Sequence, residues 1–138
     1  MKFLVLLLFT AGPASAADLP VSPSAPGARV FIVSPADGAV VHSPFKVAFG
    51  IAGMTLKPAG EAGEFSGHHH LLIDKPELPP AGQPLPNNDQ IRHFGGGQTE
   101  TELDLPAGTH TLQLLLGDFE HVPHDPPVQS EKITITVE

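Results

Sequence analysis

Hydrophobic and polar residues alternate over several short stretches of the chain, which is the spacing of a half-buried β-strand. In residues 132–137, for example, Ile133, Ile135 and Val137 share one face. No stretch repeats its apolar residues convincingly every 3.6 positions, so the pattern does not favour helices. The alternation predicts strands at 29–33, 45–51, 68–74, 99–105, 110–116 and 132–137.

Turn-forming residues separate these stretches, because the chain contains 14 glycines and 16 prolines. Six or seven short strands joined by turns predict an all-β domain, an antiparallel β-sandwich. The string "LPAGTHTL" resembles the corner before the sixth strand of an immunoglobulin-like domain, where an aromatic residue ties the corner to the backbone. Here His110 takes the aromatic position and Leu112 the core position two residues later. We therefore predict an immunoglobulin-like antiparallel β-sandwich of about seven strands, with a short strand D near Gln90–His93.

The first sixteen residues have the features of a secretory signal peptide. Lys2 precedes a short apolar run, and Ala14 and Ala16 fit a cleavage signal that predicts a cut before Ala17. The run is too short to span a bilayer, so we expect no membrane insertion after cleavage and a periplasmic or secreted location. Residues 17–28, rich in Pro, Ser and Ala, predict a disordered linker, and residues 29–138 a single β-sandwich domain.

The formal net charge of −8 narrows the classes of partner. Nucleic acids and anionic membranes require a basic surface, so neither is expected to bind this chain. The chain has no cysteine, and an exported domain without disulfides depends on packing, with a bound metal as a further source of stability.

Six of the eight histidines are predicted to lie at one end of the sandwich. They come from three segments, which are the start of the third strand, the loop that precedes residues 99–105, and the loop before the last strand. In an immunoglobulin-like fold these segments cluster at one end. The six are His68, His69, His70, His93, His121 and His124, whereas His42 and His110 belong to the opposite end.

The spacing of these histidines indicates a metal site. Alternate residues of a strand are about 6.6 Å apart on one face, so His68 and His70 are close enough to bind one ion. Imidazole ligands without a thiolate indicate a copper or zinc ion. Glu120 and Asp125 are candidates to orient the rings. A histidine-lined structural network is the other interpretation of the same pattern. The predicted metal ligands are His68, His70, His93, His121 and His124, with His69 and Met54 as further candidates.

Three strings of the sequence resemble a known family. "GHHHLLID", "HFGGGQTE" and "HTLQLLLGDFEHVPHDPPVQSEKITITV" look like the bacterial exported proteins grouped as domain of unknown function 4399. The resemblance covers nearly all of residues 29–138. It implies export, a bacterial origin and a compact β domain, and it implies no particular activity.

The predicted function is therefore metal binding in the periplasm. The histidine cluster on one loop rim would bind copper or zinc, to buffer the metal or to deliver it to a periplasmic metal-receiving protein. The alternative is a non-catalytic β-sandwich module that binds a peptide, a carbohydrate or a partner protein through the same loops. We do not expect an enzyme, because no serine lies in an elbow motif and cysteine is absent. A superoxide-dismutase-like site would share the sandwich and the His-x-His pair, but no other motif supports it.

Overall fold

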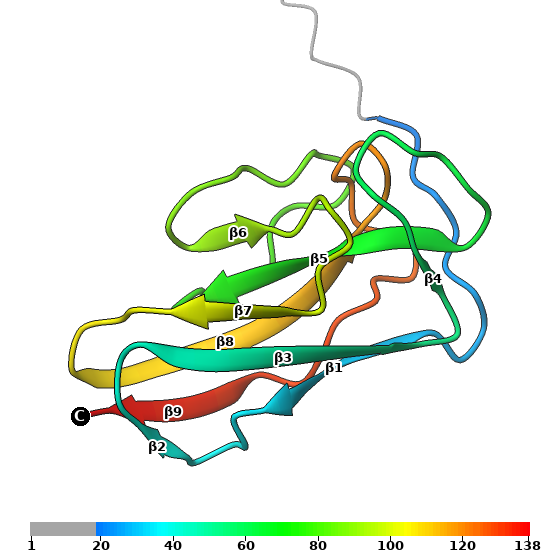
Figure 1. Cartoon of the computed structure of the whole chain (residues 1–138). Coiled ribbons are helices and arrows are strands. Elements are labelled where there is room, and N and C mark those ends of the chain that lie inside the picture. The colour runs from blue at the N-terminus through cyan, green and yellow to red at the C-terminus, as the bar shows by residue number, and fades with distance from the viewer. Residues whose placement is uncertain (1–18) are drawn as a thin grey trace, which may run out of the picture.

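The computed structural model describes residues 19–138 (Figure 1). The predicted signal peptide lies outside the described residues. Within the described part of the chain, no helix is long and apolar enough to cross a membrane. The strands are β1 (Arg29–Ser34), β2 (Val40–Val41), β3 (Phe45–Ala52), β4 (Thr55–Leu56), β5 (Ser66–Ile73), β6 (Ile91–His93), β7 (Glu100–Leu103), β8 (Gly108–Gly117) and β9 (Ile133–Val137).

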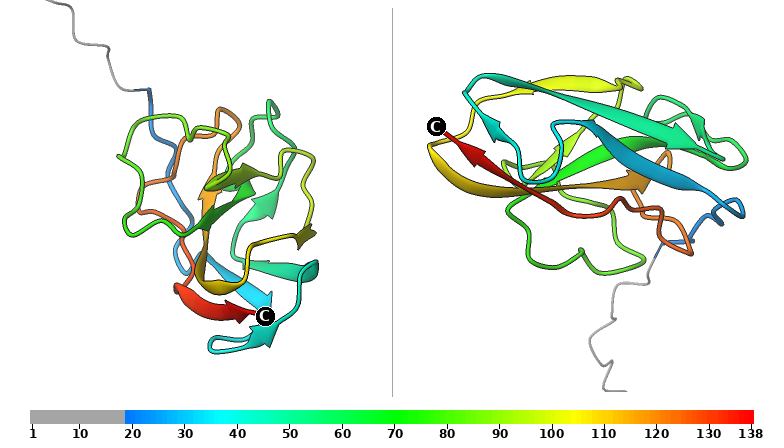
Figure 2. Two further views of the ribbon diagram at one scale, coloured as in Figure 1. Left: turned by 90° about the vertical axis from the view of Figure 1, so that its left-hand side faces the viewer. Right: turned by 90° about the horizontal axis from the view of Figure 1, so that it is seen from below.

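These strands form two sheets that pack on each other (Figure 2). One sheet has the order β1-β3-β7, and the other has the order β2-β9-β8-β5-β4 with β6 also paired to β5. Most neighbours are antiparallel, while β2 with β9 and β4 with β5 run parallel. The prediction of an all-β sandwich is confirmed. Each of the six predicted strands overlaps a strand of the structure, and these are β1, β3, β5, β7, β8 and β9.

The main core lies between the sheets, and it contains the side chains that the alternation marked as apolar. Val47 and Leu103 come from one sheet, and Leu71, Leu114 and Ile135 come from the other. All five are fully buried. The period-two pattern of the sequence is thus the pattern of side chains that enter this core.

A smaller apolar cluster lies on the opposite face of the β5–β8 sheet. It consists of Leu72, Leu85, Ile91 and Leu115. Leu72 and Leu115 alternate with residues of the main core, so their side chains point the other way. Leu85 belongs to the long connection 74–90, which runs beside this face, away from β3 (Figures 1 and 2). As a result every residue of β5 is buried.

The short strand expected near Gln90–His93 exists as β6, but its assignment as strand D is wrong. Strand D would pair with β7, whereas β6 pairs antiparallel with β5. The physical reason is the smaller apolar cluster, in which Ile91 packs with Leu72 on the outer face of the β5 sheet. The backbone of Ile73 also donates a hydrogen bond to Gln90 O (2.8 Å).

Residues 19–28 belong to the stretch predicted to be a disordered linker. In the structure they lie alongside the loop after β8. Backbone hydrogen bonds join Ser24 N to Asp125 O (3.1 Å) and Asp125 N to Ser22 O (3.0 Å). The backbone N–H of Ala25 donates to Met54 Sδ (3.3 Å). The loop that carries His121 and His124 therefore packs against this segment as well as against the sheet.

His110 ties the corner before β8 to the backbone, as the sequence predicts. Its Nε2 donates to Pro106 O (2.8 Å), and its Nδ1 donates to Asp74 Oδ2 (2.7 Å). Both partners are acceptors, so both bonds form only when both ring nitrogens carry a proton. The hydrogen bond that His110 donates to Asp74 accordingly raises the pKa of His110 above 6.5. His42 is exposed at the same end, as expected.

We expect His110→Ala to lower the free energy of unfolding by about 1–3 kcal/mol at roughly pH 5.5, because two hydrogen bonds are lost. The folded pKa is raised, so the contribution of the charged ring is fully present below 6.5 and is lost as pH rises through the folded pKa. Urea unfolding at roughly pH 5.5 and pH 9 measures this, and the loss should be smaller at the higher pH. His42→Ala is the control. An equal loss at both pH values would contradict a charged ring at the corner.

Candidate metal centre

Strand β5 supplies two histidines to one face of the sheet. Side chains alternate along a strand, so His68 and His70 point to the side of Leu72, while His69 points into the main core. In the pairing of β5 with β8, His68 lies opposite Gly117. Both rings are fully buried beneath the loops that cover this face.

His121 reaches the same place from a tight loop directly after β8. Asp118 holds this loop together, because its Oδ1 accepts the backbone N–H groups of Glu120 (2.9 Å) and Val122 (3.1 Å). The backbone N–H of His121 also donates to Asp118 O (2.9 Å). His121 has a φ of 64°, in the left-handed region that residues with a Cβ seldom adopt. The hydrogen bonds around Asp118 hold it in that conformation.

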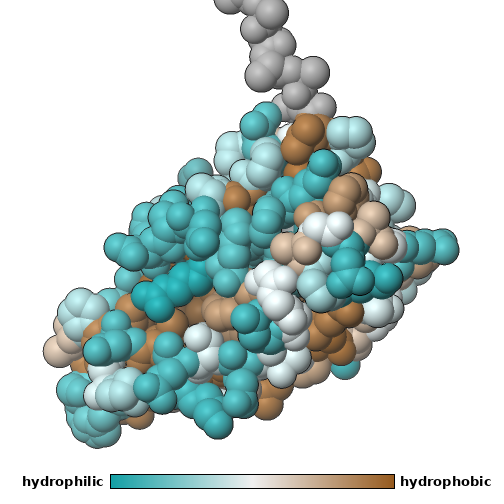
Figure 3. Space-filling model, turned by 45° about the horizontal axis from the view of Figure 1, so that its top comes forward, coloured by the Kyte–Doolittle hydropathy of each residue, from teal (hydrophilic) through white to brown (hydrophobic). Residues whose placement is uncertain are grey.

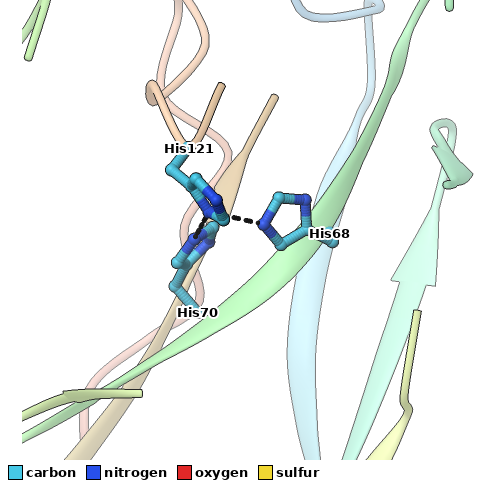
Figure 4. A group of neighbouring side chains, drawn as sticks. All are labelled: His68, His70 and His121. Atoms are coloured by element: carbon cyan, nitrogen blue, oxygen red, sulfur yellow. Dashed lines mark hydrogen bonds between the residues drawn. The ribbon is translucent and has the colours of Figure 1, made fainter. Parts of the chain in front are cut away.

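The rings of His68, His70 and His121 converge, and we call these three residues the histidine cluster (Figure 4). Nδ1 of His121 lies 2.9 Å from Nε2 of His68 and 3.2 Å from Nε2 of His70. The three nitrogens all lie within 4.8 Å of one another, which is an arrangement that can hold a metal ion. The other ring nitrogens of His68 and His70 are buried without a hydrogen-bond partner.

Burial keeps the histidine cluster uncharged. Desolvation, followed by the charge of His121, lowers the pKa of His68 to about 4. Desolvation, followed by the charge of His68, lowers the pKa of His70 to about 2. His121 is partly exposed, and its pKa is lowered by desolvation and then by the charge of His93. At neutral pH the rings are therefore neutral, and a neutral imidazole has a lone pair available for a metal.

Gly117 provides the space for one ring of the cluster. A Cβ atom at this position would lie 2.5 Å from Cε1 and 3.0 Å from Nδ1 of His70. The glycine therefore lets the His70 ring lie directly against the backbone of β8. Sequence reasoning missed this role, because a glycine at the end of a strand is ordinarily interpreted as a turn residue.

A buried carboxylate acts on the cluster, and it is not one of those expected from the sequence. Glu120 and Asp125 were the candidates to orient the rings, but both side chains are exposed. Asp118 is only 2% exposed, and its negative charge raises the pKa of His68 and His121 against the larger effect of desolvation. Its Oδ2 accepts a hydrogen bond from Ser22 Oγ (2.8 Å). An aspartate after a strand is a common turn signal, so nothing in the sequence pattern distinguishes Asp118 from a turn residue.

Two consecutive residues of the long connection 74–90 position His121 and His93, which lie on the less buried side of the cluster. The backbone N–H of Leu85 donates to His121 O (2.8 Å), and Pro86 O accepts from His93 Nε2 (2.8 Å). The ring of His93 lies beside His70 and His121, with centroid distances of 4.4 Å to each. Leu85 is buried in the smaller apolar cluster, which anchors both contacts.

The structure brings three of the five predicted ligands together and places His93 beside them. His124 is separate, since it is buried and its Nε2 donates to Ser66 O (2.9 Å). His69 lies in the main core with its ring 5.3 Å from that of Phe49 and neither nitrogen hydrogen-bonded. The sulfur of Met54 accepts its hydrogen bond from Ala25, in the segment before β1.

The fold and the site together define a β-sandwich protein with a buried histidine cluster that can hold a metal ion. The chain belongs to the family described as Domain of unknown function (DUF4399), whose model matches residues 47–138. The matched region includes the whole histidine cluster and His93. No curated protein and no solved structure matches the chain.

We expect Gly117→Ala to displace the His70 ring and to lower the free energy of unfolding by about 1–3 kcal/mol, because the added methyl group overlaps Cε1. Urea unfolding measures the stability, and NMR spectra of the imidazole nitrogens report the ring positions. Gly95→Ala is the matched control, since its Cβ would meet only Ala59 Cβ at 3.2 Å. Unchanged His70 ring signals in Gly117→Ala would contradict the close packing.

A second expectation concerns His69, whose buried nitrogens have no partners. His69→Leu replaces two desolvated polar atoms by apolar ones of similar volume, so we expect the free energy of unfolding to rise by about 1–3 kcal/mol. Denaturant unfolding of parent and variant at neutral pH tests this. A destabilisation of about 2 kcal/mol or more would instead mean that the ring fits this position better than leucine does.

Proposed function

We propose that this protein is an exported metal-binding protein that holds one copper or zinc ion in the histidine cluster. The observation that carries the proposal is the convergence of three imidazole nitrogens from two distant segments of the chain. The role we propose is buffering of the metal or its delivery to a periplasmic metal-receiving protein.

The spacing of the nitrogens supports the proposal. A Zn–N bond of 2.0–2.1 Å and tetrahedral angles require donor nitrogens about 3.4 Å apart. The two distances from His121 Nδ1, 2.9 Å and 3.2 Å, are shorter than that value by about 0.5 Å and about 0.2 Å. Because His121 lies on a loop and is partly exposed, a small shift of this one residue would open the set to a metal ion.

The chemistry of the donors supports copper or zinc. The cluster offers neutral imidazole nitrogens and no thiolate, and the Irving–Williams order favours Cu(II) at such a site. The thioether of Met54 is held by the segment before β1, so we do not include it among the ligands. The charge of Asp118, close enough to affect the pKa of two cluster residues, offsets part of the charge of a bound cation.

Export is supported by the short apolar run and the cleavage signal before Ala17. We propose that the mature protein works in the periplasm or outside the cell. We also propose a binding role and not catalysis, since the nucleophile motifs of hydrolases are missing from the sequence.

The alternative function, a non-catalytic binding module, has one observation in its favour. An apolar pocket of about 300 Å³ lies beside His124, with Val21, Leu78 and Leu115 in its wall. On the face shown in Figure 3, hydrophilic residues predominate and hydrophobic residues form separate smaller areas. A pocket of this size suits a small ligand. If the calorimetric titration with Cu(II) and Zn(II) shows no metal binding, the binding module becomes the better-supported function.

Calorimetric titration of the tag-free protein with Cu(II) and Zn(II) at neutral pH tests the proposal. We expect one ion per chain with a Kd well below about 10 μM, a level that ordinary surface histidines can reach. Replacing His68 and His70 together by alanine should abolish this binding, and His121→Ala should weaken it at least tenfold, because each change removes donors from the cluster.

His42→Ala is the control, since this histidine is exposed at the other end of the sandwich. Circular dichroism should show that each variant is folded before it is titrated. The metal proposal fails if the parent binds neither ion more tightly than about 10 μM. It fails equally if the folded double variant binds as tightly as the parent.

A further inference from the structure

We propose that the bound metal keeps one coordination position open toward the rim of the sandwich and that this position takes a small monovalent anion. The inference rests on the proposed function, because it concerns the same histidine cluster. It adds a second ligand class and makes the centre a ternary site of protein, metal and anion.

The number of donors is the first observation. Within residues 19–138, the only group of three or more histidine, aspartate or glutamate donors that converge closely enough for a metal is the histidine cluster. Four ligands complete the usual tetrahedral zinc site, and sites with three protein ligands leave the fourth position to an exchangeable group.

His93 is the neighbour best placed to close the site, and its geometry opposes this. Its Nε2 donates to Pro86 O (2.8 Å), so the lone pair of the neutral ring is on Nδ1. The ring is tilted by 31° against the ring of His121, with a centroid distance of 4.4 Å. His93 is not part of the group whose nitrogens lie within 4.8 Å of one another, which consists of His68, His70 and His121. His93 therefore borders the open position and does not fill it.

The burial of the surrounding rings determines which way the open coordination position faces. His68 and His70 are fully buried, so the metal has no access from the side of the sheet. His121 and His93 are only partly buried, and they lie on the outer side. A small ion from solvent can reach the metal along these two rings.

Charge determines which kind of ligand fits. An imidazole that binds a metal is a neutral ligand, so a divalent cation in the cluster keeps two positive charges beside two fully buried rings. Asp118 supplies one negative charge, but its oxygens already accept hydrogen bonds from Ser22, Glu120 and Val122. One positive charge remains, and burial of an uncompensated charge is unfavourable. A monovalent anion on the metal neutralises it.

Azide is the probe, because it is a small monovalent anion that changes the absorption spectra of Cu(II) and Co(II) when it coordinates. The tag-free protein is loaded with one equivalent of either ion and titrated with azide. We expect a new charge-transfer band on Cu(II), and a shifted visible spectrum on Co(II), that saturate at one azide per metal. His42→Gln should respond like the parent.

His93→Gln separates an open site from a closed one. If His93 were the fourth ligand, the loaded parent would not respond to azide, whereas His93→Gln would respond; that result overturns the inference. A parent that binds one metal but does not respond, with or without His93, also overturns it and leaves the proposed function intact. A parent that binds no metal in the calorimetric titration overturns both.

Discussion

Burial of β5 on both faces is the constraint on which the rest of the structure depends. One face of this strand enters the main core, and the other is covered by the long connection 74–90 and by the loop after β8. Imidazole rings on the second face lose their water, so their neutral form is favoured and any hydrogen-bond partner must come from neighbouring residues. His121 is the hydrogen-bond partner of both His68 and His70. The ring nitrogens that hydrogen-bond to one another on this face of the strand are the ones a metal ion would use.

The geometry of the histidine cluster is determined by segments that are far apart in the sequence. Leu85 and Pro86 bond to His121 and His93, so the packing of one leucine fixes two rings. On the other side, Ser22 bonds to Asp118, which shapes the loop that presents His121. The cluster is therefore held by loops from both sides, although two of its three rings lie on a strand. This explains how a residue with a positive φ is kept in place at the site.

Local pattern was sufficient to predict the strands, the pairing of His68 with His70 on one face, and the role of His110 at its corner. Each of these depends on alternation or on a short motif, which the sequence displays directly. The pairing of β6 with β5 was not predictable, because it depends on how Ile91 packs against Leu72 in a cluster that only the folded chain assembles. For the same reason, neither the space above Gly117 nor the buried position of Asp118 is visible in the sequence.

The cluster joins residues that are distant along the chain, since His68 and His121 are 53 positions apart. An unfolded chain does not hold these rings together, so an ion that binds the cluster binds the native state in preference. By linkage, such an ion adds to the free energy of unfolding, by about 2.7 kcal/mol when its concentration is one hundred times its Kd. Binding by the adjacent histidines at 68–70 in the unfolded chain would reduce that gain. The stability of this domain would then depend on the concentration of free metal in its surroundings.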